Sequence, residues 1–185
     1  MRFPRVVVYA GLAAVVAASV PVGATSLRRA SIAELTSTNE TVIVGTVVDA
    51  RSYWNADHTF IFTDVQIAST NVVKGKSPQE LTVTLMGGTV GETTTLIVAG
   101  PVLEPGKSYV LFLNRETLPG NNLRLTVRDH VQGVFEIRGG RAISQASEHP
   151  LVPDVQGQTA APGGAEGLPL PSLLQSIRDA ARTGR

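Results

Sequence analysis

Residues 41–48 read TVIVGTVV, a run of β-branched residues interrupted by one glycine, Gly45. β-Branched side chains favour extended strands, and a glycine inside a strand permits a bend or a close approach of another backbone. The run therefore predicts a long first strand, Thr41–Arg51, that bends at Gly45 as the wall of a small curved barrel must.

From Thr41 to Ile143, runs of β-branched and aromatic residues are broken by Gly, Pro and Asn at short intervals, as in an antiparallel sheet. The predicted strands are Thr41–Arg51, Phe60–Asn71, Leu81–Met86, Thr93–Ala99, Ser108–Asn114, Leu123–Val127, Val134–Ile137 and Arg141–Ser144. Long bent strands followed by short ones favour a closed barrel. The predicted fold class is all-β and mainly antiparallel: a small OB-like β-barrel with a short helix at each end.

One strand differs from the others in its pattern. Residues 109–113 read YVLFL and are apolar at every position, whereas Ile61, Val65 and Ile67 alternate with polar residues. Alternation indicates a strand with one solvated face, and a continuous apolar run indicates burial of both faces. We expect residues 109–113 to be buried on both sides, or covered by a helix on one side.

Two short helices are predicted. Ser31 and Glu34 have the spacing of a capping box and predict a helix near Ile32–Ser37. Ser172 begins a second helix that ends before Gly184, with an apolar face made of Leu173, Leu174, Ile177 and Ala181. A helix this short is unstable alone, so it either docks on the barrel or engages a partner.

The domain organisation follows from shifts in composition. Residues 146–171 are rich in Pro, Gly and Ala and poor in large apolar groups, which predicts a linker or a loosely held strap. The predicted segments are a signal peptide (1–24), an OB-like barrel domain (25–145), this linker (146–171) and a short helix (172–183).

The first 24 residues resemble a cleavable secretory signal peptide. Arg2 and Arg5 supply the positive charge, Val6–Val20 the apolar segment, and Val22–Ala24 small residues before a cut after Ala24. The apolar run is shorter than the roughly 20 residues that span a bilayer, although an uncleaved anchor is the alternative. The expected location is the periplasm or the extracellular medium.

Charge and cysteine content limit the partners. Loss of residues 1–24 removes two basic residues and leaves 14 basic and 15 acidic ones, a net charge of about −1. Without a basic run, neither nucleic acid nor a membrane surface is an expected partner after cleavage. The chain has no cysteine, so it has no disulfides, thiolate metal sites or cysteine nucleophile.

No catalytic or cofactor site is predicted. Each histidine follows a carboxylate, at His58, His130 and His149, but neighbouring residues in a strand point to opposite faces. No histidine pair has a helical chelating spacing, so no metal site is expected. There is no G-x-S-x-G nucleophile motif, and the glycines between Gly87 and Gly91 are expected to form a turn or bulge. A hydrolase without a recognisable motif is the third alternative for the function of this chain.

The segment Arg51–His58 joins the first two long strands and contains the chain's one tryptophan. Loops between early strands flank the ligand face of OB-like barrels, where an aromatic ring can stack on sugars, bases or peptide side chains. The alternative is that its aromatic rings cap an open end of the barrel. The candidate ligand-binding residues are Arg51, Tyr53, Trp54, Asp57 and His58.

The pattern as a whole resembles an uncharacterised group of small exported bacterial proteins with an OB-like domain. The resemblance covers most of residues 30–137. It is carried by Thr41–Val47, by the V-x-K-G turn Val72–Gly75, by Gly87-Gly88 and by Pro105–Leu113. These motifs are structural, and the resemblance implies a fold but no catalytic residue.

A more remote similarity is to the netrin-like domain of tissue inhibitors of metalloproteinases, which also has a helix, a strand of the V-x-G-x-V kind and a V-x-K-G turn. That family inhibits through an amino-terminal cysteine that chelates the protease zinc, and disulfides pin its fold. This chain has no cysteine. The similarity therefore implies a related fold without that mode of inhibition.

These observations predict an exported, non-enzymatic binding or interaction module, expected to be a monomer. Its partner is an unidentified protein or small ligand outside the cytoplasm. The alternative is an inhibitor or accessory factor of an exported hydrolase such as a protease, which would use an exposed loop as a wedge.

Overall fold

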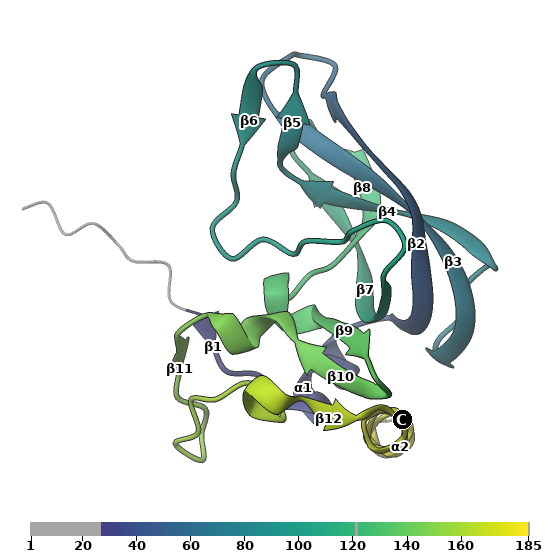
Figure 1. Cartoon of the computed structure of the whole chain (residues 1–185), viewed down its shortest axis with the longest axis vertical. Helices are drawn as coiled ribbons and strands as arrows, with labels where there is room; N and C mark the ends of the chain where they lie inside the picture. The colour runs from purple at the N-terminus through teal and green to yellow at the C-terminus, as the bar shows by residue number, and fades with distance from the viewer. Residues whose placement is uncertain (1–26, 121, 185) are drawn as a thin grey trace, which may run out of the picture.

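The computed structural model describes residues 27–120 and 122–184, so the predicted signal peptide, residues 1–24, lies outside the described part of the chain. The described residues form mostly antiparallel β-structure together with two α-helices, as predicted. Figure 1 shows a curved sheet above a second layer that contains both helices. None of the described helices is long and apolar enough to cross a membrane.

The main sheet contains eight strands in the order β12-β10-β9-β7-β2-β3-β4, with β8 paired to β7 off this path. Its strands are β2 (Thr41–Trp54), β3 (Ile61–Lys74), β4 (Glu80–Met86), β7 (Ser108–Leu118), β8 (Asn122–Thr126), β9 (Val134–Arg138), β10 (Arg141–Ser144) and β12 (Leu168–Pro169). Two small sheets pair β1 (Leu27–Arg28) with β11 (Leu151–Val152), and β5 (Gly88–Val90) with β6 (Thr93–Thr95).

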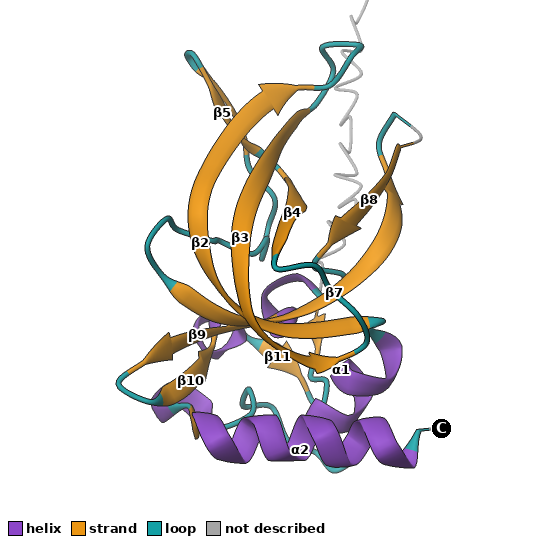
Figure 2. Cartoon of the chain, turned by 90° about the vertical axis from the view of Figure 1, so that its right-hand side faces the viewer, coloured by secondary structure: helices purple, strands orange, loops and turns teal. Residues whose placement is uncertain are grey.

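The β2–β3 hairpin is the longest element and is strongly curved (Figure 2). Its pairing shifts register between Val44 and Gly45, among other places, and such bulges bend a strand. A Cβ atom on Gly45 would lie 2.5 Å from the Cγ2 atom of Ile67. The missing side chain thus lets β2 pack closely on β3 at the bend that the sequence predicted.

The curvature does not produce a closed sheet. β8 lies beside β4 on the far side of the curve, but no ladder joins them, and no sheet closes within the described residues. Two other expectations were wrong in detail. Only Thr93–Thr95 of the predicted strand Thr93–Ala99 is a strand, and the Gly100 N–H donates to the Ile97 carbonyl to close a turn in which Ala99 has a left-handed backbone with a φ of 53°. The glycine-rich turn contains the short strand β5.

Strand β7 separates two apolar cores. Tyr109, Leu111 and Leu113 point into the concave side of the curved sheet, in a cluster with residues of β2, β3 and β4. Val110 and Phe112 point to the opposite side, in a cluster with the helices α1 (Ile32–Thr38) and α2 (Leu170–Thr183). All five are fully buried, so the predicted burial of both faces is confirmed, with helices covering one of them.

The amino-terminal helix has the predicted cap. The Glu34 N–H donates to Ser31 Oγ over 3.2 Å, and the Ser31 N–H donates to Glu34 Oε2 over 2.8 Å. The start of α2 differs from the prediction, because the helix begins at Leu170 rather than after Ser172. A proline in the first turn needs no hydrogen-bond partner for its nitrogen, so Pro171 starts the helix early. Leu173 and Ile177 of α2 are fully buried against the sheet.

The segment predicted as a linker, residues 146–171, is tied to the rest of the fold. Leu151 in β11 pairs with Leu27 in β1, and Ala161 is buried in the same small cluster as Leu151. The Asp154 carboxylate accepts hydrogen bonds from two backbone N–H groups of its own loop and from the Arg29 guanidinium. Polar contacts and small apolar groups therefore hold parts of this segment, where large apolar side chains are scarce.

Candidate functional site

Half of the predicted Arg51–His58 loop, residues 51–54, is strand. β2 continues to Trp54, and only residues 55–60 form the turn into β3. The buried Asn55 side chain shapes this turn, since its Oδ1 atom accepts the N–H groups of Thr59 (2.8 Å) and Phe60 (3.0 Å). His58 has a φ of 54° within the turn. A rigid hairpin end therefore presents Tyr53 and Trp54.

Tyr53 and Trp54 line a cavity of about 240 Å³. Its other walls come from the start of β3, from β4, and from the β7–β8 hairpin, which lies opposite the end of β2. The residues that line this aromatic pocket are Tyr53, Trp54, Asn55, Ala56, Phe62, Thr84, Leu118, Asn122 and Arg124. Tyr53, Trp54 and Asn122 are at least partly exposed, so the pocket is open to solvent.

Asp64, which does not itself line the aromatic pocket, orients two residues that do. Asp64 Oδ1 accepts hydrogen bonds from the Thr84 hydroxyl (2.6 Å) and from the Tyr53 hydroxyl (3.2 Å). Burial and the Asp64 carboxylate raise the pKa of Tyr53, so its phenol stays protonated and continues to donate. These contacts fix the orientation of the Tyr53 ring.

The aromatic rings support one another. The Tyr53 and Phe62 ring centres are 6.2 Å apart, and those of Phe60 and Phe62 are 5.1 Å apart, both in tilted arrangements. The Trp54 indole stacks on His58 with a centre distance of 6.1 Å and an interplanar angle of 24°. Aromatic pairs at these separations are mutually stabilising. The apolar wall is therefore held in place before any ligand arrives.

Arg124 brings a positive charge to the rim. It is exposed, and among the described residues it has no ion pair or side-chain hydrogen bond. Glu116 faces it across the β7–β8 pairing, but the Glu116 carboxylate lies 3.3 Å from Arg128 instead. The Arg124 guanidinium is thus available to an acceptor group on a ligand.

Three of the five predicted site residues lie together and two do not. Tyr53 and Trp54 line the pocket, and His58 stacks on Trp54. Arg51 is exposed further back along β2, and Asp57 is exposed in the turn. The pocket residues from β4 and from the β7–β8 hairpin were missed, since their approach to β2 depends on the curvature of the whole sheet.

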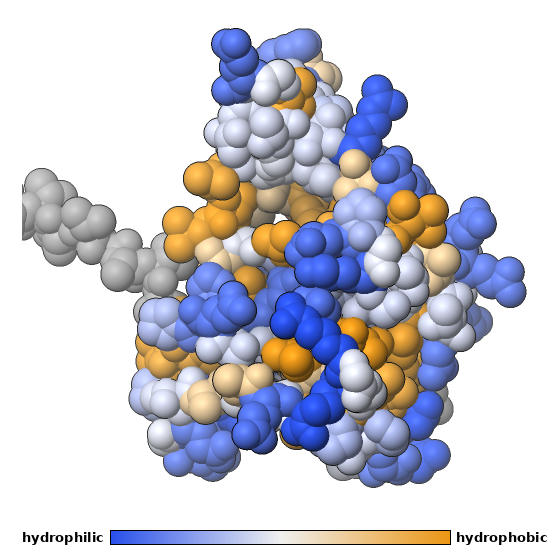
Figure 3. Space-filling view, viewed as in Figure 1, coloured by the Kyte–Doolittle hydropathy of each residue, from blue (hydrophilic) through white to orange (hydrophobic). Residues whose placement is uncertain are grey.

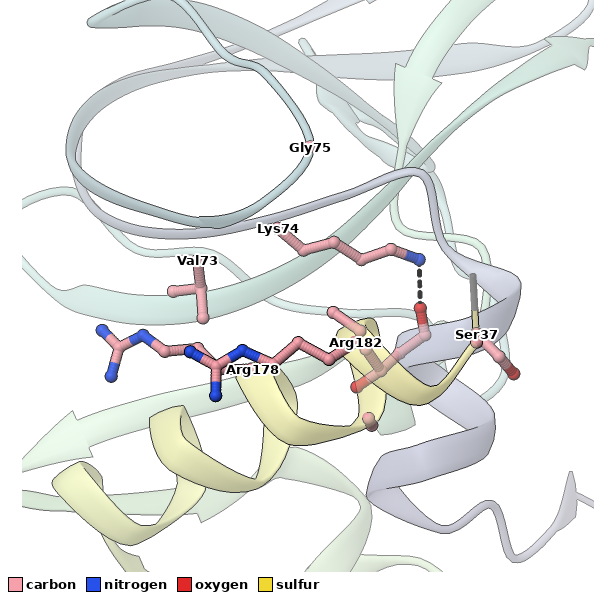
Figure 4. A pocket seen from close by; sticks show the side chains of 10 residues that line it. Ser37, Val73, Lys74, Gly75, Arg178 and Arg182 are labelled. Carbon is pink, nitrogen blue, oxygen red and sulfur yellow. Dashed lines mark hydrogen bonds between the residues drawn. The ribbon is translucent and has the colours of Figure 1, made fainter.

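A second cavity, of about 550 Å³, lies between the end of β3, the end of α1 and the last two turns of α2 (Figure 4). Three cations and no acidic residue line this basic pocket: Thr36, Ser37, Val73, Lys74, Gly75, Arg178, Ala180, Ala181, Arg182 and Gly184. Lys74 Nζ donates to the Thr36 carbonyl and, over 2.7 Å, to the Asn39 carbonyl. No sequence motif pointed to this pocket.

A third surface is the apolar loop, residues 96–103, between β6 and β7. Leu96, Val98 and Val102 expose 86%, 80% and 59% of their surface, and Figure 3 shows hydrophobic surface along this side of the molecule. The loop backbone is anchored nevertheless, because the Gln145 side chain bonds both the N–H and the carbonyl of Val102. The apolar side chains of this loop are therefore exposed although its backbone is anchored at Val102.

Within residues 27–120 and 122–184, no three His, Cys, Asp or Glu side chains lie close enough together to hold a metal ion.

No protein-family model and no curated protein sequence matches this chain. A functional assignment therefore rests on the aromatic pocket, the basic pocket and the apolar loop.

Proposed function

We propose that this chain is an exported, non-enzymatic binding module on an OB-like fold, and that its ligand occupies the aromatic pocket. The observation that carries the proposal is that the partly exposed Tyr53 and Trp54 line one cavity together with Arg124, which has no ion pair within the described residues. Ligand sites commonly combine apolar walls with a few fixed polar groups. The open, curved sheet in which β8 lies along β4 supports the OB-like description.

The lining of the pocket favours a particular ligand chemistry. Tyr53, Trp54 and Phe62 offer apolar faces to a flat ring, and Arg124 offers donors to an anionic or carbonyl group. The cavity of about 240 Å³ suits one ring with a short substituent. Such a group belongs to a small ligand outside the cytoplasm or to one side chain of a protein partner.

The polar groups at the aromatic pocket suit ligand binding better than catalysis. Asp64 Oδ1 already accepts two hydrogen bonds, and the raised pKa of Tyr53 keeps its phenol from serving as a base at neutral pH. General acid–base catalysis needs a group poised to exchange a proton near the working pH. This favours recognition without catalysis.

The export part of the proposal depends on the amino-terminal sequence. Arg2, Arg5 and the apolar run Val6–Val20 supply the features of a signal peptide, and a cut after Ala24 would release the chain into the periplasm or the medium. Its expected state there is a monomer.

The test uses the intrinsic fluorescence of Trp54, the one tryptophan of the chain. A panel of ring compounds with and without a carboxylate is titrated against the protein. We expect at least one anionic ring compound to change the emission and to bind less tightly to Arg124→Ala. Arg115→Ala is the matched control, because Arg115 is exposed on β7 and does not line the pocket. A panel without any response, or equal affinity in both variants, would overturn the proposal.

A second function, inhibition or support of an exported hydrolase, is favoured by the apolar loop. Leu96 and Val98 are almost fully exposed on a backbone that Gln145 anchors, which suits a wedge that enters a cleft. The test measures inhibition of purified serine, zinc and aspartic proteases by the protein and by a Leu96→Ser/Val98→Ser variant. Inhibition of one class that the variant loses would support this function, and equal activity in all assays would exclude it.

A further inference from the structure

The basic pocket gathers positive charge from distant parts of the chain. Lys74 comes from the end of β3, whereas Arg178 and Arg182 come from α2, and none of the ten lining residues is acidic. The chain as a whole is close to neutral, with 16 basic and 15 acidic residues. The three cations of the basic pocket are therefore a local concentration of positive charge on a nearly neutral chain. This concentration requires a physical explanation.

One such reason is the neutralisation of helix ends, and it accounts for two of the three cations. Lys74 donates to the Thr36 and Asn39 carbonyls at the end of α1. Arg182 lies in the last turn of α2, where a cation is favourable, and is 3.5 Å from Asp179. Arg178 is more than a turn further back, so the helix end does not explain it.

Arg178 is the residue without a partner. It is half-buried, and no ion pair or hydrogen bond to its side chain exists within the described residues. Figure 4 shows the Arg178 and Arg182 side chains extending along α2 on the side that faces Val73. Like charges four residues apart on a helix repel each other. An anion beside both guanidinium groups would turn this repulsion into attraction.

Lys74 adds a fixed cation at the other end of the pocket, where its ammonium group points toward the end of α1 and away from the two guanidinium groups (Figure 4). Two of its three N–H bonds are used on the α1 carbonyls, so the ammonium group is fixed and retains one donor. Burial lowers the pKa of Lys74.

We infer that the basic pocket is a binding site for a small non-aromatic molecule that carries a phosphate or sulfate group. Arginine guanidinium groups bind such oxyanions through paired hydrogen bonds. The cavity of about 550 Å³ has room for more than the oxyanion, and its remaining walls are Ser37, Gly75, Ala180 and Ala181. Without an aromatic ring in the lining, a sugar phosphate or sugar sulfate fits better than a nucleotide. This inference is independent of the aromatic pocket.

The experiment compares glucose 6-phosphate, glucose and inorganic phosphate as probes, by calorimetric titration of the intact protein at low ionic strength. We expect glucose 6-phosphate to bind and glucose to fail. Arg178→Gln should weaken binding by about tenfold or more, as the loss of a charged hydrogen bond implies. Arg128→Gln is the matched control, because it removes an equally charged side chain away from the pocket.

Each possible result either supports or overturns the inference of an oxyanion site. Phosphate that binds as tightly as glucose 6-phosphate, with the same loss in Arg178→Gln, supports the oxyanion site and assigns it to the free ion. Equal binding by both variants, binding of uncharged glucose, or no binding of any probe would overturn the inference. Thermal melting of both variants verifies that they remain folded.

Discussion

Arg29 and Asp154 are 125 positions apart in the sequence and form an ion pair in which their side chains expose only 11% and 2% of their surface. Arg29 also donates to the Ala160 carbonyl, so one guanidinium holds two points of the segment predicted as a linker. The pair joins the residues that precede α1 to the segment that precedes α2.

Replacement of Asp154 by Asn is expected to lower the melting temperature at pH 7, because it leaves the largely buried Arg29 side chain without its counter-charge. Burial opposes ionisation of this carboxyl, but the Gln158 and Gln156 N–H groups and Arg29 together lower the pKa of Asp154. Asp57→Asn in an exposed turn is the control and should melt like the wild type. Equal melting temperatures for Asp154→Asn and the control would contradict the structural role of the pair.

Glu34 makes the stability of α1 dependent on pH. Hydrogen bonds from the Ser31 backbone and from Arg28 lower the pKa of Glu34 from 4.5 to about 2. Because its folded-state pKa is depressed, the ionised carboxylate stabilises the fold above pH 4.5, and this contribution is lost as the pH falls toward 2.

Glu34→Gln should therefore reduce the free energy of unfolding at pH 7 and flatten its decline on the acid side. Denaturant titrations at a series of pH values measure both effects. Glu92→Gln, a change at an exposed position in the β5–β6 turn, should leave the pH profile unchanged. An unaltered profile in Glu34→Gln would show that the capping box carries no charge-dependent stability.

Docking of α2 should dominate the stability of the second core. Ile177 is fully buried between α2 and the sheet. We expect Ile177→Ala to cost about 2–5 kcal/mol in the free energy of unfolding, as measured by urea denaturation. Ser176→Ala, on the exposed side of the same helix, is the control and should change little. A loss below about 1 kcal/mol would mean that the helix is only loosely attached.

Gly45 is expected to be required for the curvature of β2. An alanine Cβ would lie 2.5 Å from Ile67 Cγ2 and 3.1 Å from the Ala68 carbonyl oxygen, so the two strands would have to separate. Gly45→Ala should destabilise the fold by about 1–3 kcal/mol in the same assay. Gly184→Ala, whose added Cβ meets only one atom at 3.5 Å, serves as control. Unchanged stability would show that the strands yield there at no cost.

Local patterns predicted the strands and the first helix well. The capping box at Ser31 and the apolar run at residues 109–113 each depend on neighbouring residues alone, and both were confirmed. The predicted strand Thr93–Ala99 was too long at its carboxyl end. The apolar residues there belong to an exposed loop that contains a left-handed residue, Ala99. Apolar composition alone does not distinguish a buried strand from an anchored loop.

The sites depend on long-range geometry and were only partly predictable. Tyr53 and Trp54 attract notice in the sequence, but Arg124 joins them only because the sheet curves until β8 approaches the end of β2. The absence of a basic run concealed the basic pocket, since Lys74 is remote in sequence from Arg178 and Arg182. The spacing of those two arginines on a helix was the one available signal.

The two-sided burial of β7 also determines when the chain can finish folding. Phe112 of β7 lies on the face that Leu173 and Ile177 of α2 cover. Strand β1, at the start of the described chain, pairs with β11 near its end. Residues from both ends of the chain are therefore needed to form the second core and this small sheet. Contacts this distant in sequence form slowly, because a long loop must close first. A nascent chain that still lacks α2 has an uncovered second core and stays incompletely folded. Such a delay would be compatible with the proposed export, in which a polypeptide crosses a membrane before it acquires its final shape.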